Sequence, residues 1–206
     1  METSITIYTE MTPNPNTMKF VMDKFIFTAG EAAEFLSKND AKGYSPLALE
    51  LFNFPFVKGV FIAANFVTIT KTPALSWDFI TMELRDFIRE FVNSGQTVVS
   101  QLPPDKNAEA DEEENTSSSK PKKIDSFEAS EWDEQIKHLL DEYVRPAVEM
   151  DGGHIDFLGF DNGVVTLEMK GSCAGCPSST ATLKGGIENL LKQHIDEVKE
   201  VVAING

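Results

Sequence analysis

A polar stretch in the middle of the chain cannot contribute to a packed core. Residues 101–125 hold three prolines, an acidic block, three consecutive serines and a short basic run, with almost no large apolar side chains. Such a segment buries too little apolar surface to offset the entropy lost on ordering it. We therefore predict an acidic, disordered linker at 101–125, which separates a domain at residues 1–100 from a second domain at residues 126–206.

The first domain is predicted to mix strands with helices. Runs of β-branched and aromatic residues indicate strands, and apolar residues at helical spacing between charged residues indicate a helix after Trp77. Ser45-Pro46 supplies an N-cap followed by a proline suited to the first helical turn. We expect strands at 4–8, 19–27, 57–63 and 66–71, and helices at 31–36, 45–52 and 77–92.

The second domain has the order α-β-β-α-β. An amphipathic helix is expected at 130–150, bent or shortened by Pro146 and stopped by Gly152-Gly153. A hairpin turns at Asn162-Gly163, a pair typical of two-residue hairpin turns. Its strands are expected at 155–160 and 164–169, followed by a helix at 177–194 and a last strand at 198–204. Both domains thus belong to the α+β class.

Charge and composition exclude several kinds of partner. The formal net charge of −15 disfavours binding to nucleic acid or to an anionic membrane surface, because both need clustered basic residues. No apolar run approaches the roughly 20 residues that span a bilayer. The N-terminal residues resemble neither a signal peptide nor an Arg-rich transit peptide, so we expect a cytoplasmic protein in a reducing compartment.

The only two cysteines, Cys173 and Cys176, are separated by two residues and lie between a predicted strand and a predicted helix. Pro177 fits the first turn of that helix. Unpaired N–H groups and the helix dipole at this end favour negative charge, and hence thiolate over thiol. Two thiolates could therefore converge on one metal ion or on one edge of a cluster.

Three interpretations of this pair remain open on spacing alone. An iron–sulfur cluster normally takes four thiolates, so two chains would each supply Cys173 and Cys176. A CxxC after a strand and before a helix is also the setting of a thiol–disulfide oxidoreductase. A zinc site would need two chains or a histidine, yet none of the three histidines has finger spacing to the pair. These histidines are His138, His154 and His194.

Longer motifs around the cysteines resemble a known family. Asp151-Gly152-Gly153, the run from Gly171 to Ser179 and the run from Thr182 to Glu188 are similar to the C-terminal domain of NifU-like (Nfu-type) scaffold proteins. In the first half, similarity to the N-terminal Nfu domain covers Thr12 to Asn16, Lys19-Phe20, Ser45 to Ala48, Leu51-Phe52 and the hairpin from Val57 to Ile69.

The resemblance implies a non-enzymatic iron–sulfur carrier. Such a protein would hold a labile [4Fe–4S] cluster, or a [2Fe–2S] form, on Cys173 and Cys176 of a homodimer. It would receive the cluster from upstream assembly proteins and pass it to apo iron–sulfur proteins. We expect His154 to begin a strand near the surface rather than to bind metal. Three phenylalanines could form an exposed target-binding patch, although core packing is the favoured interpretation: Phe54, Phe56 and Phe61.

Overall fold

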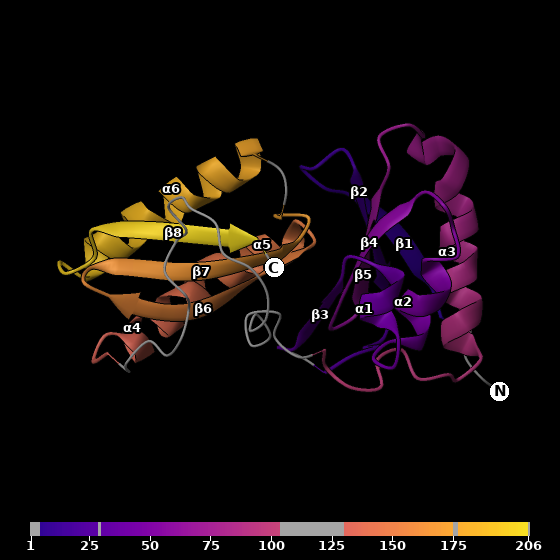
Figure 1. Ribbon diagram of the computed structural model, residues 1–206, viewed down its shortest axis with the longest axis horizontal. Coiled ribbons are helices and arrows are strands. Elements are labelled where there is room, and N and C mark those ends of the chain that lie inside the picture. Colours follow the sequence, from indigo (N-terminus) through magenta and orange to yellow (C-terminus); the bar gives the residue numbers. More distant parts are fainter. Residues whose placement is uncertain (1–4, 29, 104–129, 175–176, 206) are drawn as a thin grey trace, which may run out of the picture.

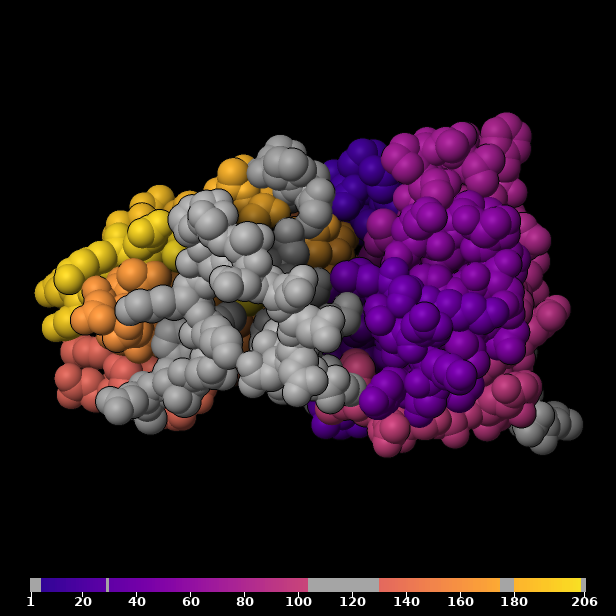
Figure 2. Space-filling view, viewed as in Figure 1, coloured from indigo at the N-terminus to yellow at the C-terminus, as the bar shows by residue number. Residues whose placement is uncertain are grey.

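The computed structural model describes residues 5–28, 30–103, 130–174 and 177–205. These residues form two units, each with its own sheet and apolar core (Figure 1). Figure 2 shows the indigo-to-magenta N-terminal unit and the orange-to-yellow C-terminal unit next to each other. Mixed helices and sheets confirm the α+β class. From residue 104 onward the predicted linker lies outside the described residues, so it stays a prediction.

The N-terminal unit is a five-stranded antiparallel sheet in the order β1-β2-β5-β4-β3. Helix α3 lies along one face of this sheet (Figure 1), and its buried residues are Ile80, Leu84, Ile88, Phe91 and Val92. The strands are β1 (Ile7–Met11), β2 (Thr17–Met22), β3 (Ala32–Phe35), β4 (Val57–Ala63) and β5 (Phe66–Lys71). The helices are α1 (Lys38–Ala41), α2 (Pro46–Leu51) and α3 (Trp77–Asn93).

Residues 32–35 form a strand, so the helix predicted at 31–36 is wrong. Ala32–Phe35 pairs antiparallel with β4, and its buried positions alternate. Ala33 and Phe35 point into the core, whereas Glu34 lies on the opposite face. Burial of alternate side chains against the sheet outweighs the helix propensity of Ala and Glu, which is a weak preference.

The C-terminal unit packs its helices against a three-stranded sheet in the order β6-β7-β8. Strands β6 and β7 form the predicted hairpin, and β8 runs parallel to β7 after the crossover through α6. The strands are β6 (Gly153–Asp161), β7 (Val164–Gly171) and β8 (Glu200–Asn205). The helical segments are α4 (Asp133–Leu139), the π-helical turn η1 (Leu140–Val144), α5 (Arg145–Met150) and α6 (Pro177–His194).

The predicted bend at Pro146 takes the form of this π-helical turn. Proline has no N–H to continue the helical ladder and crowds the carbonyl four residues before it. The chain widens over Leu140–Val144 and resumes an α-helix at Arg145. Among the described residues, no helix is both long and apolar enough to cross a bilayer.

Candidate functional site

Cys173 lies in a tight turn between the end of β7 and the start of α6. Its side chain is buried and belongs to the apolar core of the C-terminal unit. Gly171 has a φ of +71°, and its carbonyl accepts a hydrogen bond from the Ala174 N–H at 3.2 Å. Thr180, in the first turns of α6, donates its hydroxyl to the Cys173 carbonyl at 3.1 Å. Cys176 lies outside the described residues, so its predicted role is not tested.

Gly153 lies directly against the Cys173 sulfur. Residue 153 pairs with Gly171 across the β6–β7 hairpin, which brings the start of β6 to the cysteine turn. A Cβ atom at position 153 would lie 2.8 Å from Cys173 Sγ and 2.9 Å from the Lys170 carbonyl oxygen. Real Cβ atoms essentially never come this close. Gly153 therefore leaves the space that the sulfur occupies.

Gly152 directly follows the C-cap of helix α5, so the helix stops where the sequence predicted. It has a φ of +79°, and its N–H donates to the Glu149 carbonyl at 3.0 Å. The Gly152 carbonyl accepts from the Ser172 N–H at 3.2 Å, and the Ser172 hydroxyl donates to the Asp151 carbonyl. These hydrogen bonds hold Ser172, the residue before Cys173, against the C-terminal end of α5. Sequence reasoning treated the glycine pair as a turn and missed its contact with the cysteine loop.

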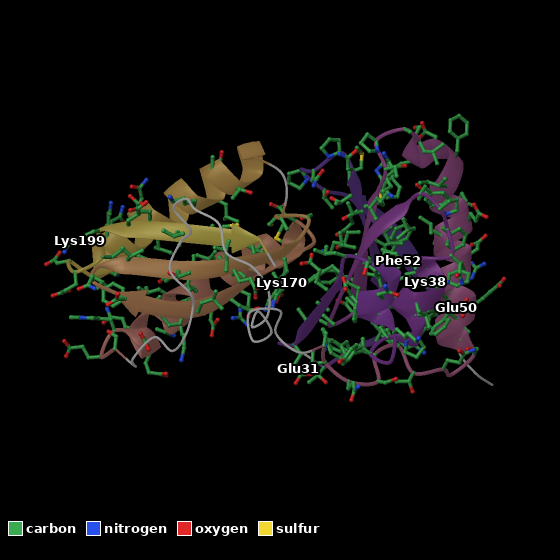
Figure 3. The ribbon with its side chains drawn as sticks, viewed as in Figure 1. Glu31, Lys38, Glu50, Phe52, Lys170 and Lys199 are labelled. Carbon is green, nitrogen blue, oxygen red and sulfur yellow. The ribbon has the colours of Figure 1, made fainter. Side chains whose placement is uncertain are left out.

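A charged network runs along β6 and β7 next to this loop. Asp156 accepts from Lys170 at 2.9 Å and lies 3.1 Å from His154 Nε2, while Lys170 also contacts Glu168 at 2.8 Å. Figure 3 shows Lys170 at the end of the sheet that faces the N-terminal unit. His154 is only 3% exposed, so the expectation of a surface side chain is wrong. The strand buries this ring beside the carboxylate.

The network shifts the pKa of two of its members. Burial alone would raise the pKa of Asp156, but hydrogen bonds and charge from His154 and Lys170 outweigh it and hold that pKa well below its usual range. Burial alone would lower the pKa of Lys170, whereas Glu168 and Asp156 raise it above its ordinary value. The described residues hold no group of three or more His, Cys, Asp or Glu side chains that could bind a metal ion.

The three phenylalanines do not form an exposed patch. Phe54 and Phe56 pack against the N-terminal core, and their rings lie 5.6 Å apart between centroids. Phe61 is 2% exposed and belongs to a separate apolar cluster on the other face of the sheet. The favoured interpretation, core packing, is confirmed for Phe54 and Phe56.

Comparisons with known proteins match both units. Residues 7–95 match the family described as scaffold protein Nfu/NifU N terminal, and residues 136–202 match the NifU-like domain. The chain belongs to the Nfu/NifU family. The predicted resemblance is therefore confirmed for both halves.

Relatives in this family are similar over almost the whole chain. The NFU1 iron-sulfur cluster scaffold homolog, mitochondrial, of Drosophila ananassae is 38% identical over 95% of this chain and 63% of its own length. NifU-like protein 4, mitochondrial, of Arabidopsis thaliana is 39% identical over 95% of this chain and 64% of its own. The chain thus spans less than two thirds of the length of these relatives.

Two solved structures are similar to parts of the chain. A NifU-like protein from Saccharomyces cerevisiae is 29% identical with a TM-score of 0.41, and the match covers 47% of this chain and 85% of that one. A protein from Staphylococcus aureus is 18% identical with a TM-score of 0.35, over 40% of this chain and 96% of that one.

The prediction of a cytoplasmic protein is wrong. The Nfu/NifU relatives from Drosophila and Arabidopsis are both named as mitochondrial. The prediction rested on the absence of targeting features in the first residues. Targeting peptides lie outside the folded domains and are removed from mature proteins, so the residues that build the fold carry no information on the compartment.

Proposed function

We propose that this chain holds an iron–sulfur cluster on Cys173 and Cys176 and delivers it to apo-proteins, acting as a carrier and not as an enzyme. The observation that carries the proposal is a two-cysteine loop within a chain that has both Nfu/NifU domains. Relatives that share about 38% of its residues are named iron-sulfur cluster scaffolds. The cluster is cargo in this proposal, since it must leave again.

The donor count sets the stoichiometry of the proposed site. Thiolates are the usual ligands of iron–sulfur clusters, and a [4Fe–4S] cluster takes four of them. The chain has two cysteines, so a complete set needs Cys173 and Cys176 from each of two chains. A homodimer bridged by the cluster follows from this count. A site split between two chains can release its cargo as the chains part, which suits transfer between upstream assembly proteins and apo-protein clients.

Anaerobic reconstitution of the full chain with iron and sulfide tests the proposal. We expect a brown dimer with about four irons per pair of chains, and transfer of the cluster to an apo-protein that lacks one. Cys173→Ser and Cys176→Ser should each lose the bound iron and the dimer. Gly185→Ala is the control for α6, because an added Cβ there meets no atom within 4 Å; it should retain the cluster.

The opposite result identifies the rival function. A chain that stays colourless and monomeric under these conditions, yet catalytically reduces disulfides, would be a thiol–disulfide oxidoreductase. Zinc in protein purified without air, with no iron taken up, would likewise contradict the carrier.

A further inference from the structure

One face of the N-terminal sheet is buried although the helices of its own unit cover the other face. Strand residues alternate between the faces, so β4 sends Val60 and Ile62 to the helix side and Phe61 to the opposite side. On that opposite side lies a small apolar cluster, 2–5% exposed, made of Val21, Phe61, Ala63 and Phe66. We call this side the cover face.

The C-terminal unit points its cysteine end at the cover face. Figure 1 shows the start of β6 and the end of β7 directed toward the N-terminal sheet, with α3 on the far side of that sheet. In Figure 3, Lys170 lies at this end of the C-terminal unit and Lys199 at the opposite end. Strands β4 and β5 both contact β7. The contact therefore falls on the end of the unit that carries Cys173, and not on its far end.

Two side chains of the cover face hold the segment that precedes β6. The buried hydroxyl of Thr68, on β5, donates to the Gly152 carbonyl at 2.8 Å. Lys19, on β2, donates to the Met150 carbonyl at 3.3 Å. Met150 ends helix α5, where a positive charge is favourable. Lys19 is itself held in place by Glu10 at 3.1 Å.

Two more side chains hold the residues that lead into Cys173. The carboxylate of Glu34, on β3, accepts a hydrogen bond from the Gly171 N–H at 2.7 Å. The side-chain amide of Asn14 donates to the Ser172 carbonyl at 3.5 Å. These four bonds end on backbone atoms within three residues of Gly153 or Cys173.

The glycines allow this approach. A Cβ atom on Gly171 would lie 3.1 Å from a ring carbon of Phe61, and one on Gly152 would lie 2.8 Å from the Thr68 hydroxyl. A side chain at either position would push the units apart. The contact between the units therefore requires that Gly152 and Gly171 have no side chain.

We propose that the cover face is an intramolecular lid on the cysteine loop, and that it must leave the loop when two chains share a cluster. This proposal rests on the proposed function only for the event that opens the lid, which is the sharing of a cluster by two chains. A shared cluster requires two cysteine loops to face each other. In the closed chain, Gly171 and Ser172 are occupied by Phe61, Glu34 and Asn14, and Cys173 is 5% exposed. Closure and dimer formation therefore compete for one surface, which keeps the empty chain protected.

Hydrogen exchange at the Gly171 amide reports the lid directly, because its partner is Glu34 of the other unit. The Ser172 amide, bonded to Gly152 within the C-terminal unit, is the internal reference. In the cluster-free chain with both units, Thr68→Val removes a hydrogen bond to Gly152 and keeps the shape of a strand residue. We expect Gly171 to exchange about tenfold faster, the effect of losing one buried hydrogen bond, while Ser172 changes less.

Thr81→Val is the matched control. It removes a hydroxyl that bonds to the Trp77 carbonyl within α3, on the far side of the sheet. Exchange at Gly171 should then match that of the parent chain. If Thr68→Val unfolds the N-terminal unit, Lys19→Met replaces it, since it removes the bond to Met150 instead.

The second experiment measures the same exchange after the cluster is loaded. The Gly171 amide should then also exchange faster, because the lid opens. Unchanged exchange in a folded Thr68→Val chain would overturn the lid, as would full protection of Gly171 in a cluster-loaded dimer. A chain that takes up no cluster but shows faster exchange in Thr68→Val would refute the proposed function and still support the contact.

Discussion

Gly153→Ala should destabilise the C-terminal unit and displace the Cys173 sulfur. The added methyl group would lie 2.8 Å from Sγ and 2.9 Å from a backbone oxygen, both inside a packed region. Cys173 is 5% exposed, so its sulfur has little room to retreat. Forcing an extra methyl group into a packed core typically costs about 1–3 kcal/mol. We expect a loss of this size in the free energy of unfolding.

The same substitution at Gly185 should act in the opposite direction. Gly185 is exposed within α6, and a Cβ there would meet no atom within 4 Å. Alanine in a helix is favoured over glycine by about 0.5–1 kcal/mol. The two variants therefore share the chemical change and differ only in the space around it.

Urea unfolding followed by fluorescence measures both. The chain has two tryptophans: Trp77 packs against the N-terminal core and Trp132 against the C-terminal core. A Trp77→Phe background leaves Trp132 as the reporter of the C-terminal unit. With a slope of about 1 kcal/mol/M for a unit this small, Gly153→Ala should lower the midpoint by about 1–3 M. A midpoint equal to or above that of the parent, with Gly185→Ala raising it, would refute the close approach of Gly153 to the sulfur.

Two further substitutions test the charged network and a helix cap. Because the folded state lowers the pKa of Asp156, its contribution to stability is present above the unfolded value of about 3.9 and is lost as pH falls below it. The stability gap between the parent and Asp156→Asn, at most about 1 kcal/mol for a carboxylate this exposed, should therefore narrow below about pH 4 in urea titrations. Asp161→Asn removes a carboxylate from an exposed position on the same strand and serves as the control. Ser45→Ala should cost the N-terminal unit about 1–3 kcal/mol in thermal unfolding, because the buried hydroxyl caps α2 and donates to the Val98 carbonyl at 2.7 Å. Ser37→Ala, which removes the exposed cap of α1, should cost less.

Elements defined by local chemistry were predictable from the sequence. Ser45 accepts from the Ala48 N–H and Pro46 occupies the first turn of α2, as a capped helix start requires. Asn162 and Gly163 have φ values of +51° and +92°, which a two-residue hairpin turn needs. In each case the residues that specify the structure are neighbours in the chain, so a short window contains the whole signal.

Elements defined by distant partners were not predictable. Residues 32–35 become a strand because β4, more than twenty positions later, supplies the ladder. The contact between the units could not be predicted from the sequence for the same reason, since its partners are also distant in the chain. Lys19, Glu34 and Thr68 come from three strands and bond to backbone atoms, which carry no signature in the sequence. The position of the cysteine loop could be predicted from the sequence, but its contact with the cover face could not.

The glycines around the cysteine loop are required for different physical reasons, and their backbone φ angles distinguish these reasons. Gly152 and Gly171 have positive φ values, so the turns alone would favour glycine there. Gly153 does not share that conformation, and a turn does not explain why it has no side chain. A glycine in ordinary strand geometry indicates a close approach of other atoms, and here the approaching atom is the Cys173 sulfur. The motif Asp151-Gly152-Gly153 therefore meets two separate constraints. Gly152 adopts the backbone conformation that stops the helix, and Gly153 leaves the space that the Cys173 sulfur occupies.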